Sequence, residues 1–246
     1  MKTSLTITIF LICKSLTCFS QTFIDTLKHD IKNISLVSVI KNDLTILKNQ
    51  RQFVTMYESD YDFGAKTLNC QFYYDKFDYT LIGHFINNNI FSIELFKISE
   101  DREMTVYNSE YQFLDTSLAK QHLTKHNSVF RSNNKLNDFF YNKFYQFSYS
   151  CGFVGQTSAS MIDCLYIIKN KNRKDLVSLA SSVSPTDRAY GVFGLYILGQ
   201  LGTNLTDREK YLIKLNQNSK TKAYSCSGCI SGTQSLSSLL DNDSLK

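Results

Sequence analysis

Two cysteines separated by two residues, Cys226 and Cys229, form the most specific chemical pattern in the sequence. Such a pair can close a tight structural disulfide, act as a redox pair or supply half of a metal site. A redox pair needs a thiolate at a helix N-terminus in a β-α-β context, whereas here a predicted helix and a polar loop precede the pair. A zinc site needs further ligands, and the sequence has no second Cys-x-x-Cys or Cys-x-x-His. We therefore favour a disulfide between Cys226 and Cys229, with the redox and metal interpretations left open.

His122 and His126 are four residues apart in a segment, residues 117–126, that is predicted to be a helix. This spacing lets two imidazoles reach a single metal ion, so they join Cys226 and Cys229 as candidate metal ligands. A metalloprotease helix carries its glutamate base directly after the first histidine, and here that position is Leu123. Because such a pair arises easily by chance, we expect both histidines to be exposed to solvent.

The sequence contains no complete catalytic pattern. The stretch from Gly152 to Gly155 lacks the Gly-Lys-Ser/Thr ending of a phosphate loop, so it predicts a turn followed by a helix N-cap at Thr157 or Ser158. There is no Gly-x-Ser-x-Gly elbow. Acidic candidates lie in the loops and on the polar face of the predicted sheet, where we expect them only to aid solubility: Asp60, Asp62, Asp75, Asp78, Glu94 and Glu100. We predict no catalytic residue and no cofactor.

The first twenty residues have the pattern of a cleavable signal peptide. Lys2 precedes a short apolar stretch, residues 5–13, and Ser20 supplies the small residue that a cleavage site requires. Lipid anchoring is the alternative, but neither Cys13 nor Cys18 follows a small residue. The predicted location is therefore secreted or periplasmic.

Removal of this segment would leave five cysteines, which are Cys70, Cys151, Cys164, Cys226 and Cys229. In an oxidising compartment cysteines pair where geometry allows, so we expect two disulfides and one odd cysteine.

The charge balance gives no sign of a polyanionic partner. The chain has 27 basic and 22 acidic residues, and loss of Lys2 and Lys14 with the signal peptide leaves 25 against 22, a net charge of +3. No run of five or more Lys and Arg residues occurs, so we do not expect nucleic-acid binding. Polar residues interrupt every later apolar run, so we predict no transmembrane span in the mature chain.

The N-terminal part of the mature chain mixes helical and strand patterns. Residues 22–50 have helical periodicity, with a break near Asn33 and Ser35. Aromatic and β-branched runs then predict four strands, at residues 68–74, 79–86, 90–98 and 104–113. Asn87–Asn89 predicts a tight turn between two of them, because asparagine tolerates positive φ. We expect a small antiparallel meander with one buried and one largely wet face, followed by helices over residues 117–126 and 136–147.

The C-terminal part predicts four short-looped helices from residue 157 onward. Ser184 and Pro185 are an N-cap and a first-turn proline, and Thr206 with Glu209 forms a capping box. Short connections predict that neighbouring helices pack antiparallel.

This series of hairpins resembles HEAT-type helical repeats, which mostly bind other macromolecules. The order of export signal, mixed segment, Ser150-Cys151-Gly152, helices and Cys226–Ile230 also resembles uncharacterised secreted bacterial proteins, and that resemblance implies no activity. The predicted fold class is α+β: N-terminal helices with a small antiparallel meander, then a HEAT-like helical segment. We expect a signal peptide at 1–20, a mixed α/β domain at 21–150 and a helical hairpin domain at 151–246.

These observations favour an exported, non-catalytic interaction or scaffold protein that binds a protein or envelope partner through a helical-repeat-like surface. The alternative is an exported thiol/disulfide or metal-binding protein that uses Cys226 and Cys229. The sequence leaves the oligomeric state and the identity of the partner open.

Overall fold

The computed structural model describes residues 23–49, 52–101, 104–140, 146–151, 156–227 and 230–241. The predicted signal peptide lies outside these residues. The helices are α2 (Phe23–Asn33), α3 (Val37–Asn49), α4 (Thr116–Phe130), α5 (Ala159–Lys169), α6 (Arg173–Ala180), α7 (Pro185–Gln200), α8 (Asp207–Gln217) and α9 (Leu236–Leu239), with 3-10 turns η2 (Asp62–Gly64) and η3 (Leu136–Phe139). The strands are β1 (Val54–Asp60), β2 (Lys66–Tyr74), β3 (Phe77–Ile86), β4 (Asn89–Asp101), β5 (Met104–Leu114), β6 (Ser150–Cys151), β7 (Gln156–Thr157), β8 (Lys222–Ser227) and β9 (Ile230–Ser235). The predicted α+β class is confirmed.

A five-stranded antiparallel sheet in the order β1-β2-β3-β4-β5 forms the centre of the molecule. The four predicted strands correspond to β2–β5, and β1 was not predicted. The turn between β3 and β4 forms where the asparagines predict it, with Asn87 and Asn88 at φ values of 48° and 72°. The meander prediction is therefore confirmed.

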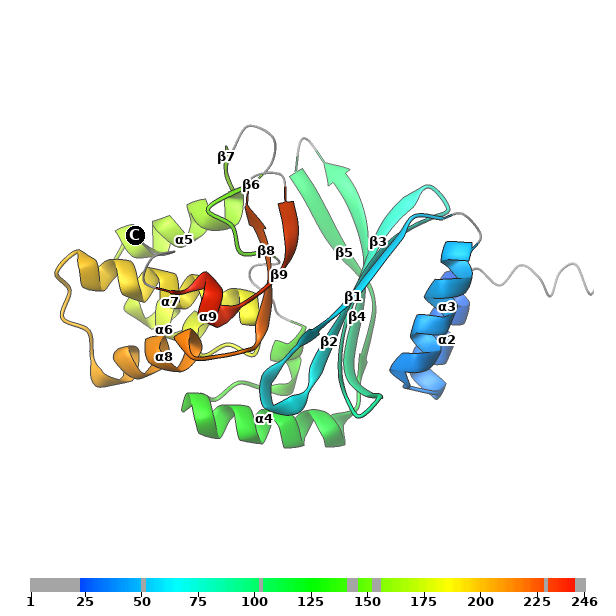
Figure 1. Cartoon of the computed structure of the whole chain (residues 1–246), viewed down its shortest axis with the longest axis horizontal. Coiled ribbons are helices and arrows are strands. Elements are labelled where there is room, and N and C mark those ends of the chain that lie inside the picture. The colour runs from blue at the N-terminus through cyan, green and yellow to red at the C-terminus, as the bar shows by residue number, and fades with distance from the viewer. Residues whose placement is uncertain are drawn as a thin grey trace, which may run out of the picture.

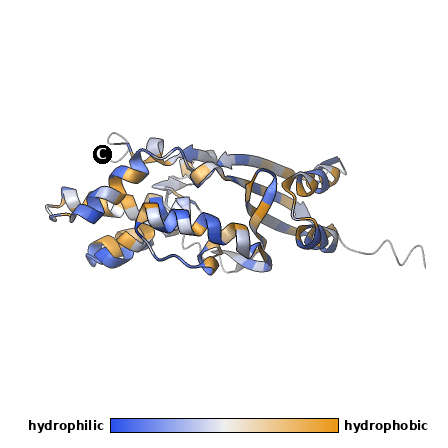
Figure 2. Ribbon diagram, turned by 90° about the horizontal axis from the view of Figure 1, so that it is seen from below, coloured by the Kyte–Doolittle hydropathy of each residue, from blue (hydrophilic) through white to orange (hydrophobic). Residues whose placement is uncertain are grey.

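Helices α2 and α3 cover one face of this sheet (Figure 1). They separate at Ser35, which has a φ of 52°, close to the break that the sequence predicts. Figure 2 shows that each helix has a hydrophobic and a hydrophilic side. The apolar sides pack on the alternate residues of β2 and β3 that face them, and the core of this layer includes Leu27, Ile31, Ile40, Leu44, Leu68, Cys70, Phe72 and Leu81.

The other face of the sheet is buried over much of β1–β4, which corrects the expectation of a largely wet face, whereas Ser109 and Gln112 of β5 are exposed on it. Its polar side chains that are shielded from solvent include Ser59, Thr67, Thr80, His84, Ser92 and Glu94. This face lies toward α4 and the C-terminal helices (Figure 1). The alternation of apolar and polar residues along β3 and β4 therefore separates two buried environments instead of core and solvent.

The four predicted C-terminal helices are confirmed as α5–α8. Their predicted caps form: Ser158 Oγ accepts from the amide of Met161, and Thr206 and Glu209 make the reciprocal capping box. Helix α7, which begins at Pro185 as predicted, is buried along most of its length and packs against α5, α6 and α8. The HEAT-like assignment stays a prediction.

Two other segments differ from expectation. Where the sequence predicts a helix over residues 136–147, the described residues form the short turn η3 at its start and an extended Phe147, which pairs with Ser225, at its end. Residues 141–145 lie outside the described ranges. The amide of Phe147 donates to the Tyr224 carbonyl at 2.8 Å. Strand β8, which receives this contact, lies where a polar loop was predicted before Cys226, and its pairing with β9 was not predicted, since the Ser, Thr and Gly residues of the two strands give little apolar alternation.

None of the helices in the described part of the chain combines the length and the hydropathy that crossing a membrane requires.

We predict that Gly191→Ala destabilises the protein because α6 and α7 cross too closely for a side chain. A Cβ at Gly191 would lie 2.2 Å from the backbone nitrogen of Ala180, an atom that cannot rotate away. We expect a loss of about 1–3 kcal/mol in the free energy of unfolding, despite the better helix propensity of alanine.

The matched control is Gly232→Ala in β9, where no heavy atom lies within 4 Å of the added Cβ. Urea denaturation should show a change of no more than about 0.5 kcal/mol for this control. Equal stability of the two variants would contradict the close crossing.

Candidate functional site

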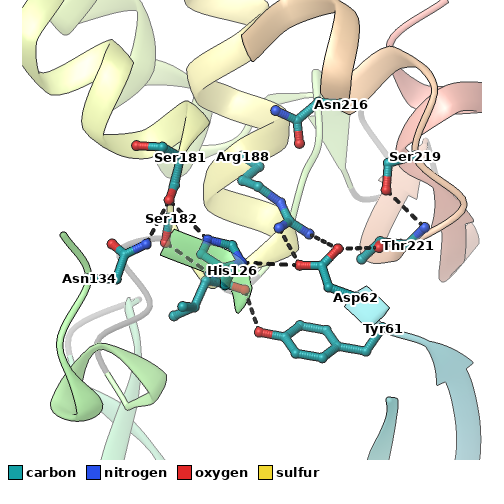
Figure 3. A network of polar contacts seen from close by, with 12 residues as sticks. Tyr61, Asp62, His126, Asn134, Ser181, Ser182, Arg188, Asn216, Ser219 and Thr221 are labelled. Carbon is teal, nitrogen blue, oxygen red and sulfur yellow. Dashed lines mark hydrogen bonds and ion pairs between the residues drawn. The ribbon is translucent and has the colours of Figure 1, made fainter. Parts of the chain in front are cut away.

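A buried network of charged and polar side chains joins the sheet to the C-terminal helices (Figure 3). Asp62 in η2 accepts two hydrogen bonds from Arg188 in α7, at 2.5 Å and 3.1 Å. Its Oδ1 also accepts from Thr221 Oγ1 at 2.6 Å, just before β8. His126 of α4 brings Nδ1 to 3.5 Å from Asp62 Oδ2. Four distant segments therefore meet at one carboxylate.

The surroundings of Asp62 keep it ionised although it is buried. Burial alone would raise the pKa of Asp62, but the Arg188 charge, the contact with His126 and the hydrogen bonds from Arg188 and Thr221 hold the pKa well below its usual value. Arg188 is 0% exposed, and its guanidinium lies 4.7 Å from the centre of the Phe130 ring. Such a bidentate pair, enclosed by aromatic rings, has the geometry of a structural ion pair.

His122 and His126 are both buried, so the expectation that they are exposed is wrong. They lie on the inner face of α4, and their rings do different things. His126 Nε2 donates to the Ser181 carbonyl at 3.2 Å, whereas His122 stacks between Tyr61 and Phe91 with ring centroids 5.1 Å from each. Both imidazoles therefore pack between α4 and the elements that it contacts.

In the described ranges, no three His, Cys, Asp or Glu side chains come together in a way that could hold a metal ion. The candidate ligand Cys229 lies outside these ranges.

His84 and His122 are uncharged at neutral pH. Burial lowers the pKa of His84 to about 3 and that of His122 to about 4, with smaller contributions from neighbouring charges. His84 stacks on Tyr61 at 4.5 Å, and its Nδ1 lies 3.0 Å from Thr67 Oγ1. A general base works best with a pKa near the working pH, so these rings are better suited to packing than to proton transfer.

The described cysteines contradict part of the predicted disulfide pattern. Cys70 and Cys164 are buried thiols, and Cys164 Sγ donates to the Tyr190 carbonyl at 3.6 Å. Only three of the five cysteines then remain, so the two predicted disulfides cannot both form. Cys226 is buried in β8. Its disulfide with Cys229 stays a prediction, because Cys229 lies outside the described residues.

The outer face of α5 exposes an apolar surface that nothing in the described part of the chain covers. Ile162 is 56% exposed, Leu165 45% and Tyr166 68%. The opposite face of the same helix is buried in the core through Met161, Cys164, Ile167 and Ile168. Exposed Asp163 and Lys169 border the apolar residues. We call Ile162, Leu165 and Tyr166 the α5 face.

Sequence reasoning missed both partners of the central ion pair and misplaced Glu94. Asp62 and Glu94 were expected to be wet, and both are buried. One signal was available: Arg188 directly precedes a strongly apolar helix segment, and an arginine is almost never fully buried without a partner. The identity of that partner could not be read from the sequence, since Asp62 is 126 residues away.

The chain matches no family model, no curated protein and no solved structure in sequence or fold comparisons.

We predict that His122→Phe stabilises the protein and weakens its sensitivity to acid. Neither ring nitrogen of His122 has a hydrogen-bond partner among the described residues, and leaving them unpaired costs about 1–3 kcal/mol. The folded pKa of about 4 lies below the ordinary value of 6.5, so the unfolded chain binds more protons between these values. The contribution of uncharged His122 to the stability of the wild type is therefore fully present above pH 6.5 and is lost as the pH falls toward 4.

Urea denaturation at pH 7, 6 and 5 should show that the advantage of His122→Phe grows by up to about 1.4 kcal/mol per pH unit. His29→Phe, at a histidine whose side chain is 63% exposed, should follow the wild type. Parallel pH profiles for the wild type and His122→Phe would refute a buried, uncharged His122.

Proposed function

We propose that this protein is an exported, non-catalytic interaction protein that binds a protein partner through its helical C-terminal segment, with the α5 face as the contact. The observation that carries this proposal is the exposure of Ile162, Leu165 and Tyr166 on one side of a helix whose other side is already buried. An amphipathic surface helix would carry polar residues there.

The composition of the α5 face suits a protein interface. Large apolar and aromatic residues at the centre with charged residues at the rim are typical of binding surfaces, and tyrosine is common among residues that dominate affinity. Asp163 lies toward the start of α5 and Lys169 at its end. A matching partner surface is apolar, with a basic group opposite Asp163 and an acidic group opposite Lys169.

The buried polar network supports binding over catalysis. Arg188 and Thr221 both donate hydrogen bonds to Asp62, and these contacts position α7 against η2. His84 and His122 are held uncharged inside an aromatic cluster. The groups most able to do chemistry are therefore engaged in maintaining the fold.

Export is the part of the proposal that rests on sequence alone. The pattern of residues 1–20 supports a secreted or periplasmic location, where the partner would be a secreted or envelope protein. Stacked helical hairpins, the arrangement expected from the HEAT-like pattern, commonly present such binding surfaces.

We predict that Ile162→Ser combined with Tyr166→Ser abolishes partner binding and leaves the fold intact. Residues 21–246 would be immobilised and exposed to envelope extract, and each captured protein would then be purified and titrated. A partner that uses the α5 face should bind at least about tenfold more weakly to the double variant, since buried aromatic and aliphatic contacts dominate affinity. The matched control is Phe53→Ser, at an exposed aromatic of 66% on another part of the molecule.

Two outcomes would contradict the proposal: no protein binds saturably, or the bound protein is retained by the double variant and lost with Phe53→Ser. Unfolding midpoints of all variants would confirm that only the surface has changed.

A further inference from the structure

A small cavity lies between the polar face of the sheet, the start of α7 and the hairpin β8–β9. Its volume is about 50 Å³, and it is lined from three directions. The sheet contributes Ser59, Thr67 and His84, α7 contributes Thr186, and the hairpin contributes Lys222 and Thr233. The cavity is separate from the α5 face and from the Asp62 carboxylate.

The floor of the cavity is one cross-strand row. Ser59 of β1 pairs with Thr67 of β2, and Thr67 pairs with His84 of β3, so the three side chains lie next to one another on the same face. All three residues are more than nine-tenths buried. Since Nδ1 of His84 is engaged with Thr67, its Nε2 is the ring nitrogen that can serve a ligand, and it has no hydrogen-bond partner within the described part of the chain.

The charges around the cavity favour an anion. Lys222 is the one charged residue of the lining, and no Asp or Glu belongs to it. Two buried acids already accept hydrogen bonds from other groups: Asp62 from Arg188 and Thr221, and Glu94 from Ser109 and Gln112, both at 2.7 Å. Asp187 in the first turn of α7 accepts from Ser182 at 3.3 Å.

Several other lining groups are hydrogen-bond donors suited to oxygen atoms, and they lie beside the apolar side chains of Ile82, Phe139 and Val183. Hydroxyl groups that can donate to a ligand come from Ser59, Thr186 and Thr233. The Thr67 hydroxyl donates to Nδ1 of uncharged His84, which leaves the Nε2–H of that ring to donate to the ligand. Helix α7 starts at the edge of the cavity, so the positive end of its dipole adds to the same field. Lysine, hydroxyl and imidazole donors around one small volume form an arrangement that holds a compact oxyanion.

We propose that this cavity binds a small oxyanion, a carboxylate or a phosphate, with Lys222 as its counter-ion and with His84 and the surrounding hydroxyls as donors. A water molecule takes about 30 Å³ of liquid volume, so the cavity admits a ligand of very few heavy atoms or the anionic end of a larger molecule.

Calorimetric titration of residues 21–246 with inorganic phosphate, acetate and glycerol tests this inference. We expect saturable binding of at least one of the two anions and none of glycerol. Lys222→Met should weaken that binding at least tenfold. Lys220→Met is the matched control, because Lys220 is two residues away in the same segment and lines a different hollow; it should bind like the wild type. The phosphate and acetate arms distinguish the two anion classes.

The NMR signals of the His84 ring provide a second readout, since a bound anion beside Nε2 should shift them in proportion to occupancy. The inference is overturned if neither anion saturates, if glycerol binds as tightly as the anions, or if Lys220→Met and Lys222→Met lose binding equally. These outcomes do not depend on the α5 face, whose partner binding is measured separately.

Discussion

A buried ion pair between Asp62 and Arg188 is the interaction on which the rest of this structure depends. Each charge would be strongly unfavourable in the interior alone, and each is acceptable only because the other is in contact. Asp62 belongs to the turn that leads into the sheet, and Arg188 to the central helix of the C-terminal part. The pair therefore requires the two parts of the chain to meet in one relative arrangement.

The neighbouring contacts follow from that requirement. Tyr61, next to Asp62, donates to the Val183 carbonyl at 2.7 Å, and Thr221 brings the start of β8 to the same carboxylate. Helix α4 closes the site with His126, whose ring stacks on Phe130 at 4.2 Å. Because the second face of the sheet is thereby covered, its polar residues become buried, and burial lowers the pKa of His84 and of His122 in α4 so that both are uncharged. The cavity beside Lys222 is part of the same covered face.

Local signals in the sequence predicted local structure well. The asparagine turn, the capping box at Thr206 and the cap at Ser184 each depend on residues a few positions apart, and all three form. The predictions that were wrong concerned residues whose environment depends on partners far away in the sequence. The exposure of His126 could not be judged without knowing that Asp62 and Ser181 lie beside it, and the extended conformation of Phe147 depends on β8, which follows some 75 residues later in the sequence.

The residue types of the candidate site suggest more chemistry than their contacts support. A carboxylate, histidines and an arginine close together invite a catalytic interpretation, but here Asp62 and Arg188 form an ion pair that connects two parts of the fold. The surface that we propose for partner binding is the outer side of α5, where Ile162 and Tyr166 are exposed.

A double-mutant cycle measures the coupling of the ion pair, with Asp62→Asn, Arg188→Met and the double variant compared by urea denaturation. We predict that each single substitution costs about 3–5 kcal/mol in the free energy of unfolding, because it leaves a buried charge without its partner, and that the double variant costs much less than the sum. If a single variant fails to fold, recovery of the fold in the double variant is the same result. Additive losses within about 0.5 kcal/mol would contradict the claim that this pair ties the sheet to the helices.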